Sequence, residues 1–364
     1  MRVSLHAADL HYHGGLVLHT ASSGSVPFLR ELFLYLDDGD VAGCGETRLN
    51  IAYLNGLSEQ QVTADAVAAI TGADWSRDPA DLLAEMDGWA ARYTAPVRML
   101  IDGALHDIVA RRAGRSVADW LGAPASSAVR SPSNQTLFWS SHSSFIQRAD
   151  AYVQRGFRDL KVRIAAGRME DDLHRVASLR DRFGDTIKIA ADANGQWTAA
   201  DAPDRLNALS AYGLSYIEQP IPPGDWDAIG RLAETSPIPI MLDEGLGSAA
   251  DVARVCEFGG RVLAHLKLVK LGGIAPTMAA ARRLSAAGVP FMIGQMNEGG
   301  VATAAALHTA CASAPAYREL YGADGLADDP ASGLTYADGA VSVGASSGLG
   351  ITFDATRTQL IQEF

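Results

Sequence analysis

Short apolar runs alternate with amphipathic helical stretches along most of the chain after residue 129. This alternation is typical of parallel strands joined by crossover helices, because such strands are buried on both faces. The strand candidates number eight, as a closed (β/α)8 barrel needs. In chain order they are RSPSNQTLF, DLKVRI, IKIAADAN, SYIEQP, IPIMLDEG, LAHLKLVK, VPFMIGQM and YRELYG.

The first third of the chain has a different pattern. Two β-like runs, RELFLYLDD and VAGCGE, precede the helical stretches VTADAVAAI and VRMLIDGALHDIVARRAG. We therefore expect an α+β domain over residues 1–124, followed by the connector LGAPASSAVRSPS at the boundary. The α/β barrel is expected over residues 125–326. Residues 327–364 return to turns and short strands, and we expect them to pack back on the first domain.

An open, doubly wound α/β sheet is the competing architecture. Such a sheet favours a glycine-rich phosphate loop directly after its first strand. The segment SNQTLFWSSHSS contains no glycine, so the pattern favours the barrel.

Charge and cysteine usage narrow the class of protein. The formal net charge is -12, and Lys and Arg are not clustered as a phosphate-binding surface requires, so we expect no nucleic-acid partner. Cys44, Cys256 and Cys311 are far apart and lack the spacing of a zinc site or a disulfide framework. No apolar run is long enough to span a bilayer. We therefore expect a cytoplasmic protein without a membrane partner.

Three carboxylates stand where three consecutive predicted strands end. Asp192 ends the third strand, Glu218 the fourth and Asp243 the fifth. The carboxyl ends of barrel strands form the face on which active sites lie, so these side chains are expected to converge. Converging carboxylates repel one another unless a cation lies between them. The pattern therefore predicts a site for a divalent cation.

Oxygen-only ligands suit Mg²⁺, or Mn²⁺, and such a metal can bind a substrate carboxylate in place of water. Asn194 and Glu244 lie beside these ligands in the sequence and are candidates to support them. The alternative is that each acid caps the next helix or pairs with a surface lysine. That alternative explains one acid better than three acids at matching strand ends.

Cationic residues lie on the second and sixth predicted strands. Lys161 and Arg163 are two residues apart, so both point to the same side of their strand, and Lys267 lies on the sixth strand. These two strands flank the strands with the acids, which puts cations on opposite sides of the metal. A lysine beside a metal and another cation has its neutral form favoured, and that form can act as a general base. The metal would stabilise the enediolate that is left.

Simpler interpretations of these lysines and their neighbours stay open. Lys161 and Lys267 could be salt-bridged residues at the barrel edge, although inside apolar strands an unpaired lysine is costly. Lys270 lies three residues after Lys267 and is expected to face the other way. Glu298, at the end of the seventh predicted strand, could orient Lys267 or accept a proton, with a loop glutamate as the simpler alternative.

Several stretches, in the correct order, match the motifs of one known family. They are GFRDLKVRI, IAADANGQW, YIEQP, MLDEG, HLKLVKLGGI, QMNEGG with the following AALH, and DGAVSVGASSGLGITFD. Through them the chain resembles, over nearly its whole length, the mandelate racemase and muconate lactonizing enzyme branch of the enolase superfamily. The resemblance implies an N-terminal capping domain on a barrel, Mg²⁺ held by Asp192, Glu218 and Asp243, and Lys267 as acid/base, as in the muconate lactonizing subgroup. Barrels of this family commonly assemble, which implies a homo-oligomer.

The second strand departs from the family pattern. The family has Lys-x-Lys there, with the second lysine as the opposing acid/base, and this chain has Arg163 at that position. A guanidinium stays protonated and is a poor proton acceptor. Lys267 is therefore the favoured base, and racemisation or epimerisation requires Lys161 to serve as the second one. Elimination of water, or cycloisomerisation from one face, is better supported.

Substrate contacts are expected from the loops of the capping domain, around HYHGGLVLHTASSG and ETRLNIAYLNGLS. For each candidate in these loops, an ordinary polar loop residue is the alternative. On the first barrel strand, Thr136 and Asn134 are candidates to line the pocket. The capping-domain candidates are Arg48, Tyr53, Asn55, His11 and His13.

The residues leave four functions open. The first is a Mg²⁺-dependent isomerase or cycloisomerase, and the second is a hydroxy-acid or acid-sugar dehydratase, a lyase that uses the same proton abstraction. The third is a Schiff-base enzyme with Lys161 or Lys267, and the fourth is a carboxylate-binding protein without turnover. The dipeptide epimerases are less favoured, because YGADGLADDP lacks a clear Asp-x-Asp motif. In each case we expect a small-molecule carboxylate, since a metal with Lys161, Arg163 and Lys267 outweighs three ligand carboxylates.

Overall fold

The largest sheet of the protein has eight parallel strands. The computed structural model describes residues 1–15, 17–20, 24–124 and 128–364. Within it, neighbouring strands of the sheet run parallel in the order β14-β13-β12-β11-β10-β9-β8-β7. Their bounds are β7 (Gln135–Leu137), β8 (Asp159–Arg163), β9 (Lys188–Asp192), β10 (Ile217–Glu218), β11 (Ile240–Leu242), β12 (Val262–Lys267), β13 (Phe291–Gly294) and β14 (Tyr317–Glu319).

The two outer strands of this sheet are linked through the residues that flank them. The Asn134 N–H donates to the Arg318 carbonyl at 3.0 Å, and the Leu320 N–H donates to Ser133 Oγ at 2.9 Å. The sheet is therefore nearly closed, which confirms the predicted (β/α)8-type barrel. The first predicted strand divides in two at Pro132, and only β7 belongs to the barrel, because β6 (Val129–Pro132) pairs with β17 (Ala340–Val343) instead.

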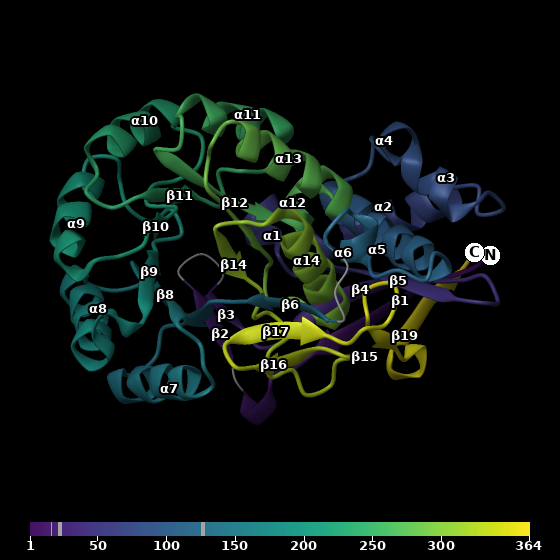
Figure 1. The fold of residues 1–364 in the computed structure, drawn as a ribbon, viewed down its shortest axis with the longest axis horizontal. Coiled ribbons are helices and arrows are strands. Elements are labelled where there is room, and N and C mark those ends of the chain that lie inside the picture. The colour runs from purple at the N-terminus through teal and green to yellow at the C-terminus, as the bar shows by residue number, and fades with distance from the viewer. Residues whose placement is uncertain (16, 21–23, 125–127) are drawn as a thin grey trace.

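Helices cover the outer face of the barrel (Figure 1). Helix α8 shows why these segments are helical: Glu170 and Asp171 lie in its first turn and Arg180 and Arg182 in its last, so both ends complement the helix dipole. The bounds are α7 (His142–Gln154), α8 (Met169–Phe183), α9 (Ala202–Leu209), α10 (Trp226–Thr235), α11 (Ala249–Glu257), α12 (Leu268–Leu271), α13 (Ile274–Ala286) and α14 (Gly300–Ser313).

An apolar layer fills the inside of the barrel. Four of its five residues, all except Met292, stand two positions before an inward-facing polar residue, because side chains of a strand alternate between its faces. Tyr216 precedes Glu218 in this way, and Leu263 precedes His265. The layer therefore forms a floor on which the polar residues rest. It consists of Ala190, Tyr216, Met241, Leu263 and Met292.

A second, antiparallel sheet has the order β19-β1-β4-β5. Helix α5 (Ala95–Arg112) packs directly on β5. A Cβ atom at Gly45 would lie 1.9 Å from the Leu100 carbonyl oxygen, and one at Gly43 would lie 2.6 Å from Ile108 N. Only glycine allows this approach at both positions. The strands are β19 (Gln359–Glu363), β1 (Arg2–Leu10), β4 (Leu29–Asp37) and β5 (Ala42–Arg48).

The remaining elements are short, apart from helix α2. This helix begins with a capping box, in which Ser58 and Gln61 satisfy each other's backbone N–H groups. Within the described residues, no helix is both long and apolar enough to cross a membrane. The other elements are α1 (Ala52–Asn55), α2 (Glu59–Thr71), α3 (Pro79–Ala84), α4 (Met86–Trp89), α6 (Val117–Trp120), β2 (Leu18–Thr20), β3 (Gly24–Val26), β15 (Ala331–Ser332), β16 (Thr335–Ala337), β18 (Thr352–Phe353) and the 3-10 helices η1 (His13–Gly15), η2 (Gly184–Thr186), η3 (Ser210–Tyr212) and η4 (Ala355–Arg357).

His308 makes the stability of this fold depend on pH. The side chain lies buried on α14 and accepts a hydrogen bond from the Ala118 N–H at 2.9 Å. Burial lowers the pKa of His308 to about 4, against 6.5 in the unfolded chain. Its contribution to stability is therefore present above pH 6.5 and is lost as the pH falls toward 4, by at most about 3 kcal/mol.

The measurement is urea unfolding at pH 7.5 and pH 5 for the wild type and for His308→Gln, which cannot take up the proton. We expect the wild type to lose more stability between the two pH values than the variant. Equal losses in both proteins would contradict this assignment.

Candidate active site

Three buried carboxylates meet at the carboxyl ends of adjacent barrel strands. Asp192 is the last residue of β9, Glu218 is the last of β10, and Asp243 directly follows β11. Asp192 and Glu218 are register partners across their two strands. Burial raises the pKa of Asp192 to about 6, although Arg163 opposes the shift. Burial also raises the pKa of Glu218, against the effect of Lys161. The convergence predicted from the three strand ends is therefore present.

Two cations from β8 face these acids. The Lys161 side chain is 0% exposed and donates to Glu218 Oε2 at 2.9 Å, with Asp192 Oδ2 at 3.6 Å. Arg163 forms an ion pair with Asp192 and donates to Asn194 Oδ1 at 3.2 Å. Burial acts to lower the pKa of Lys161, but Glu218 and Glu319 raise it well above its ordinary value. The two residues therefore point to the same side of the strand, as their spacing predicts.

Two lysines, not one, contact Asp243. Lys267 Nζ lies 2.5 Å from Asp243 Oδ2 and 3.7 Å from Met296 Sδ. Lys270 Nζ lies 2.6 Å from Asp243 Oδ1. The expectation that Lys270 faces away is wrong, because β12 ends at Lys267 and Lys270 belongs to helix α12, whose turn brings it back toward the acid. Burial alone would raise the pKa of Asp243, but Lys267 and Lys270 lower it well below its ordinary value.

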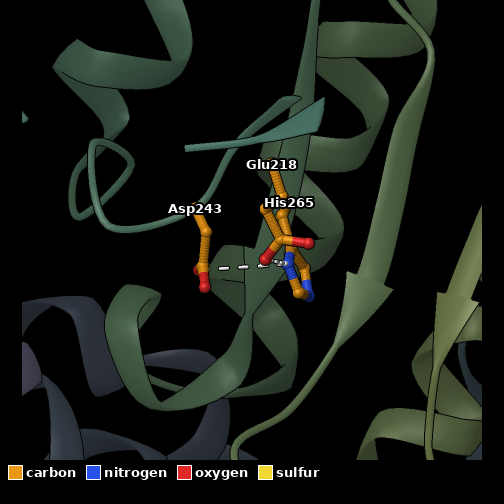
Figure 2. A group of neighbouring side chains, drawn as sticks. All are labelled: Glu218, Asp243 and His265. Atoms are coloured by element: carbon orange, nitrogen blue, oxygen red, sulfur yellow. Dashed lines mark hydrogen bonds and ion pairs between the residues drawn. The ribbon is translucent and has the colours of Figure 1, made fainter. Parts of the chain in front are cut away.

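His265 and Glu319 also belong to this cluster, and the sequence analysis missed both. His265 Nδ1 lies 3.0 Å from Glu218 Oε1 and 3.9 Å from Asp243 Oδ1 (Figure 2). Glu319, the last residue of β14, pairs with Lys161 and accepts a hydrogen bond from Asn134 Nδ2 at 3.0 Å. Burial would raise the pKa of Glu319, but Lys161, His265 and Lys267 lower it to about 2. For His265, the available signal was a polar residue inside an otherwise apolar strand, VLAHLK.

A small cavity opens beside the acids. Lys267 and Arg163 reach it from opposite sides of the barrel, since β12 and β8 are four strands apart in the eight-stranded sheet. Lys161 does not line this cavity. Tyr53 and Leu54 reach it from helix α1, and Tyr53 is 40% exposed. The lining residues are Tyr53, Leu54, Arg163, Asn194, Asp243, Glu244, Lys267, Gln295, Met296, Asn297 and Tyr321.

Glu244 and Asn194 lie together at this cavity. Asn194 Nδ2 donates to Glu244 Oε1 at 3.1 Å. Burial and then the charge of Asp243 raise the pKa of Glu244 to about 7. Both residues therefore stand beside the acids, where the sequence analysis expected supporting groups.

Several other predicted site residues lie outside the cavity lining. Glu298 is buried and accepts a hydrogen bond from the Met296 N–H at 3.1 Å, and burial raises its pKa to about 7. Arg48 is buried and donates to the Asn297 carbonyl at 2.9 Å. Thr136 is buried in register with Lys161. The structure therefore brings these three near the site without placing them at the cavity wall.

The remaining loop candidates have partners of their own or lie at the surface. His11 Nδ1 lies 2.7 Å from Asp328 Oδ2, and Asn55 Oδ1 accepts a hydrogen bond from the Leu57 N–H at 2.9 Å. His13 is exposed in η1. None of the three lines the cavity.

The donor atoms at the site fit a hard divalent cation. Asp192, Glu218 and Asp243 supply carboxylate oxygens, the ligands that Mg²⁺ prefers. Ligand atoms of Glu218, Asp243 and His265 lie within 4.8 Å of one another. The ammonium and guanidinium groups described above supply the positive charge that such a cluster requires.

Comparison with known proteins agrees with this geometry. A family model described as "Enolase C-terminal domain-like" matches residues 144–357, more than half of the chain. N-succinyl-L-Arg/Lys racemase of Bacillus cereus is 27% identical over 60% of this chain, and the match spans 59% of that relative, less than two thirds of its length. Chloromuconate cycloisomerase of Delftia acidovorans is 31% identical, over 70% of this chain and 69% of its own.

A solved structure of muconate lactonizing enzyme from Pseudomonas fluorescens, complexed with muconolactone, superposes with a TM-score of 0.88. It is 25% identical and covers 98% of this chain and 96% of its own. The family model, the relatives and this structure agree with the motifs in the sequence. The chain therefore belongs to the mandelate racemase and muconate lactonizing enzyme family of the enolase superfamily.

Proposed function

We propose that the protein removes the proton α to the carboxylate of a small-molecule substrate, with Lys267 as the base, as an isomerase of the cycloisomerase type. The observation that carries this proposal is the difference between the two lysines. Lys267 lines the cavity, whereas Lys161 does not line it and is fully buried in pairs with Glu218 and Glu319. Proton transfer is therefore supported on one face of the substrate only.

Arg163 occupies the opposite face in this proposal. Its guanidinium reaches the cavity and is bound to Asp192 and Asn194. Because an arginine does not give up its proton, this residue can hold an anionic group but cannot take the α-proton. A reaction that requires bases on both faces is correspondingly less supported.

Asp192, Glu218 and Asp243 would hold Mg²⁺, or Mn²⁺, in the active protein. When bound, this cation would stabilise the negative charge that develops on the substrate carboxylate as the proton leaves. The chain's own contribution is to hold these oxygens in place and to hold the substrate's α-carbon within reach of Lys267 Nζ. Residues 1–124 would close the mouth of the barrel, with Tyr53 and Leu54 at the cavity.

A dehydratase is the second candidate, favoured by the same asymmetry. The α-proton would pass to Lys267 Nζ, which would return it to a hydroxyl group on the neighbouring carbon; the C–O bond would then break, so that water leaves and a carbon–carbon double bond forms. Arg163 and Tyr321 line the cavity and could hold that hydroxyl group. The product formed separates this reaction from cycloisomerisation.

The direct test is proton NMR in D₂O with a panel of small carboxylates, with and without Mg²⁺. We expect a Mg²⁺-dependent loss of the α-proton signal that a chelator added beforehand prevents, because the carboxylate site requires the cation. A substrate that binds tightly without exchange would favour a carboxylate-binding protein. Borohydride trapping of a substrate in the absence of metal would favour a Schiff-base enzyme.

Lys267→Met removes the proposed base and keeps the aliphatic stem. We expect turnover to fall by a factor of about 10²–10⁴, with Mn²⁺ binding largely kept. Lys270→Met is the matched control, because Lys270 contacts the same carboxylate outside the cavity. We expect it to lose less turnover than Lys267→Met, and equal losses would remove Lys267 from the role of base.

Arg163→Lys restores the lysine of the family pattern on the second strand. We expect wild-type protein to exchange the α-proton of one enantiomer, and the variant to gain exchange of the other, because a second base then reaches the cavity. Chiral analysis of the products in D₂O measures this. If the wild type already exchanges both enantiomers, Lys161 serves as the second base and the one-face proposal is wrong.

A further inference from the structure

His265 lies at the centre of the acid cluster and has no part in the proton transfer proposed above. It faces the inside of the barrel two residues before Lys267, and its side chain is fully buried. It follows Leu263 of the apolar layer by two residues on β12, and its Nδ1 lies 3.0 Å from Glu218 Oε1 (Figure 2). An imidazole at this distance either donates to the carboxylate or offers a lone pair to a metal.

The contact with Glu218 determines which ring nitrogen carries the proton. An ionised carboxylate only accepts hydrogen bonds, so a bare Nδ1 at 3.0 Å would place two acceptors against each other. With Glu218 ionised beside Lys161, the proton is assigned to Nδ1, whose N–H then donates to Glu218 Oε1. Glu218 Oε2 accepts from Lys161 at 2.9 Å. Each oxygen of Glu218 thus has its own donor.

The other ring nitrogen is closed off by the neighbouring strand. Nε2 is buried and has no hydrogen-bond partner among the described residues. A Cβ atom at Gly294 would lie 2.0 Å from Nε2, so the ring fills the space that a side chain on β13 would occupy. If Nδ1 bound a metal, the proton would have to move to Nε2, where it would be a buried donor without an acceptor.

We propose that His265 is a positioning residue that holds Glu218 for metal binding, and that it is not itself a ligand. This inference rests on the metal site of the proposed function. Groups of this kind beside a ligand typically change metal affinity by about 10–100-fold when they are removed. His265 and Lys267 are two residues apart and therefore point to the same face of β12. The proposed positioning residue and the proposed base thus lie on one strand.

The test is the affinity for Mn²⁺, followed by electron paramagnetic resonance, in the wild type, His265→Leu and His265→Asn. The leucine variant lacks the donor, whereas the asparagine amide can offer an N–H close to the position of Nδ1. We expect His265→Leu to bind Mn²⁺ about 10–100-fold more weakly, and His265→Asn to recover most of that loss. Far-UV circular dichroism checks that each variant is folded.

Unchanged affinity in His265→Leu, or no recovery in His265→Asn, would overturn the positioning role. A wild type that does not bind Mn²⁺ contradicts the metal site itself, which separates the two failures. If the variants do not fold, nitrogen-15 NMR of the wild-type imidazole with saturating Mg²⁺ decides the question. A proton that stays on Nδ1 supports the proposal, and a proton that moves to Nε2 shows a metal ligand and refutes it.

Discussion

Repulsion among buried carboxylates is the constraint on which the arrangement of this barrel mouth depends. Asp192, Glu218 and Asp243 lie on neighbouring strands away from bulk water, where like charges are costly. Cations on both sides compensate this negative charge through ion pairs. Lys161 and Arg163 come from β8, Lys267 comes from β12 and Lys270 comes from α12. The strict alternation of strand side chains then puts apolar residues directly beneath this layer.

The cations on the two sides are not equivalent. Lys161 is fully buried and pairs with Asp192, Glu218 and Glu319. Lys267 has a carboxylate on one side and the cavity on the other. The two sides of the cavity therefore carry different cations, Lys267 on one side and Arg163 on the other. Arg163 strengthens this difference, because its charge is permanent.

Local patterns were enough to predict the eight strands and the three acids, because strand length and strand ends are set within a few residues. Glu319 was missed because its importance comes from Lys161, on a strand that is far away in the chain. Lys270 was misjudged because β12 passes directly into α12, so the alternation of a strand stops at Lys267. His265 alternates with Lys267 along β12, but its contact with Glu218, on a strand distant in the chain, could not be read from the local pattern.

The pairing of β19 with β1 has a consequence for the newly made chain. Residues 2–10 are synthesised before the barrel, whereas their outer partner, residues 359–363, is synthesised after it. Until then β1 is an open edge that can pair with strands of other nascent chains. The outer edge of β1 is therefore covered only after all the barrel strands have been made, although β1 itself precedes them in the chain.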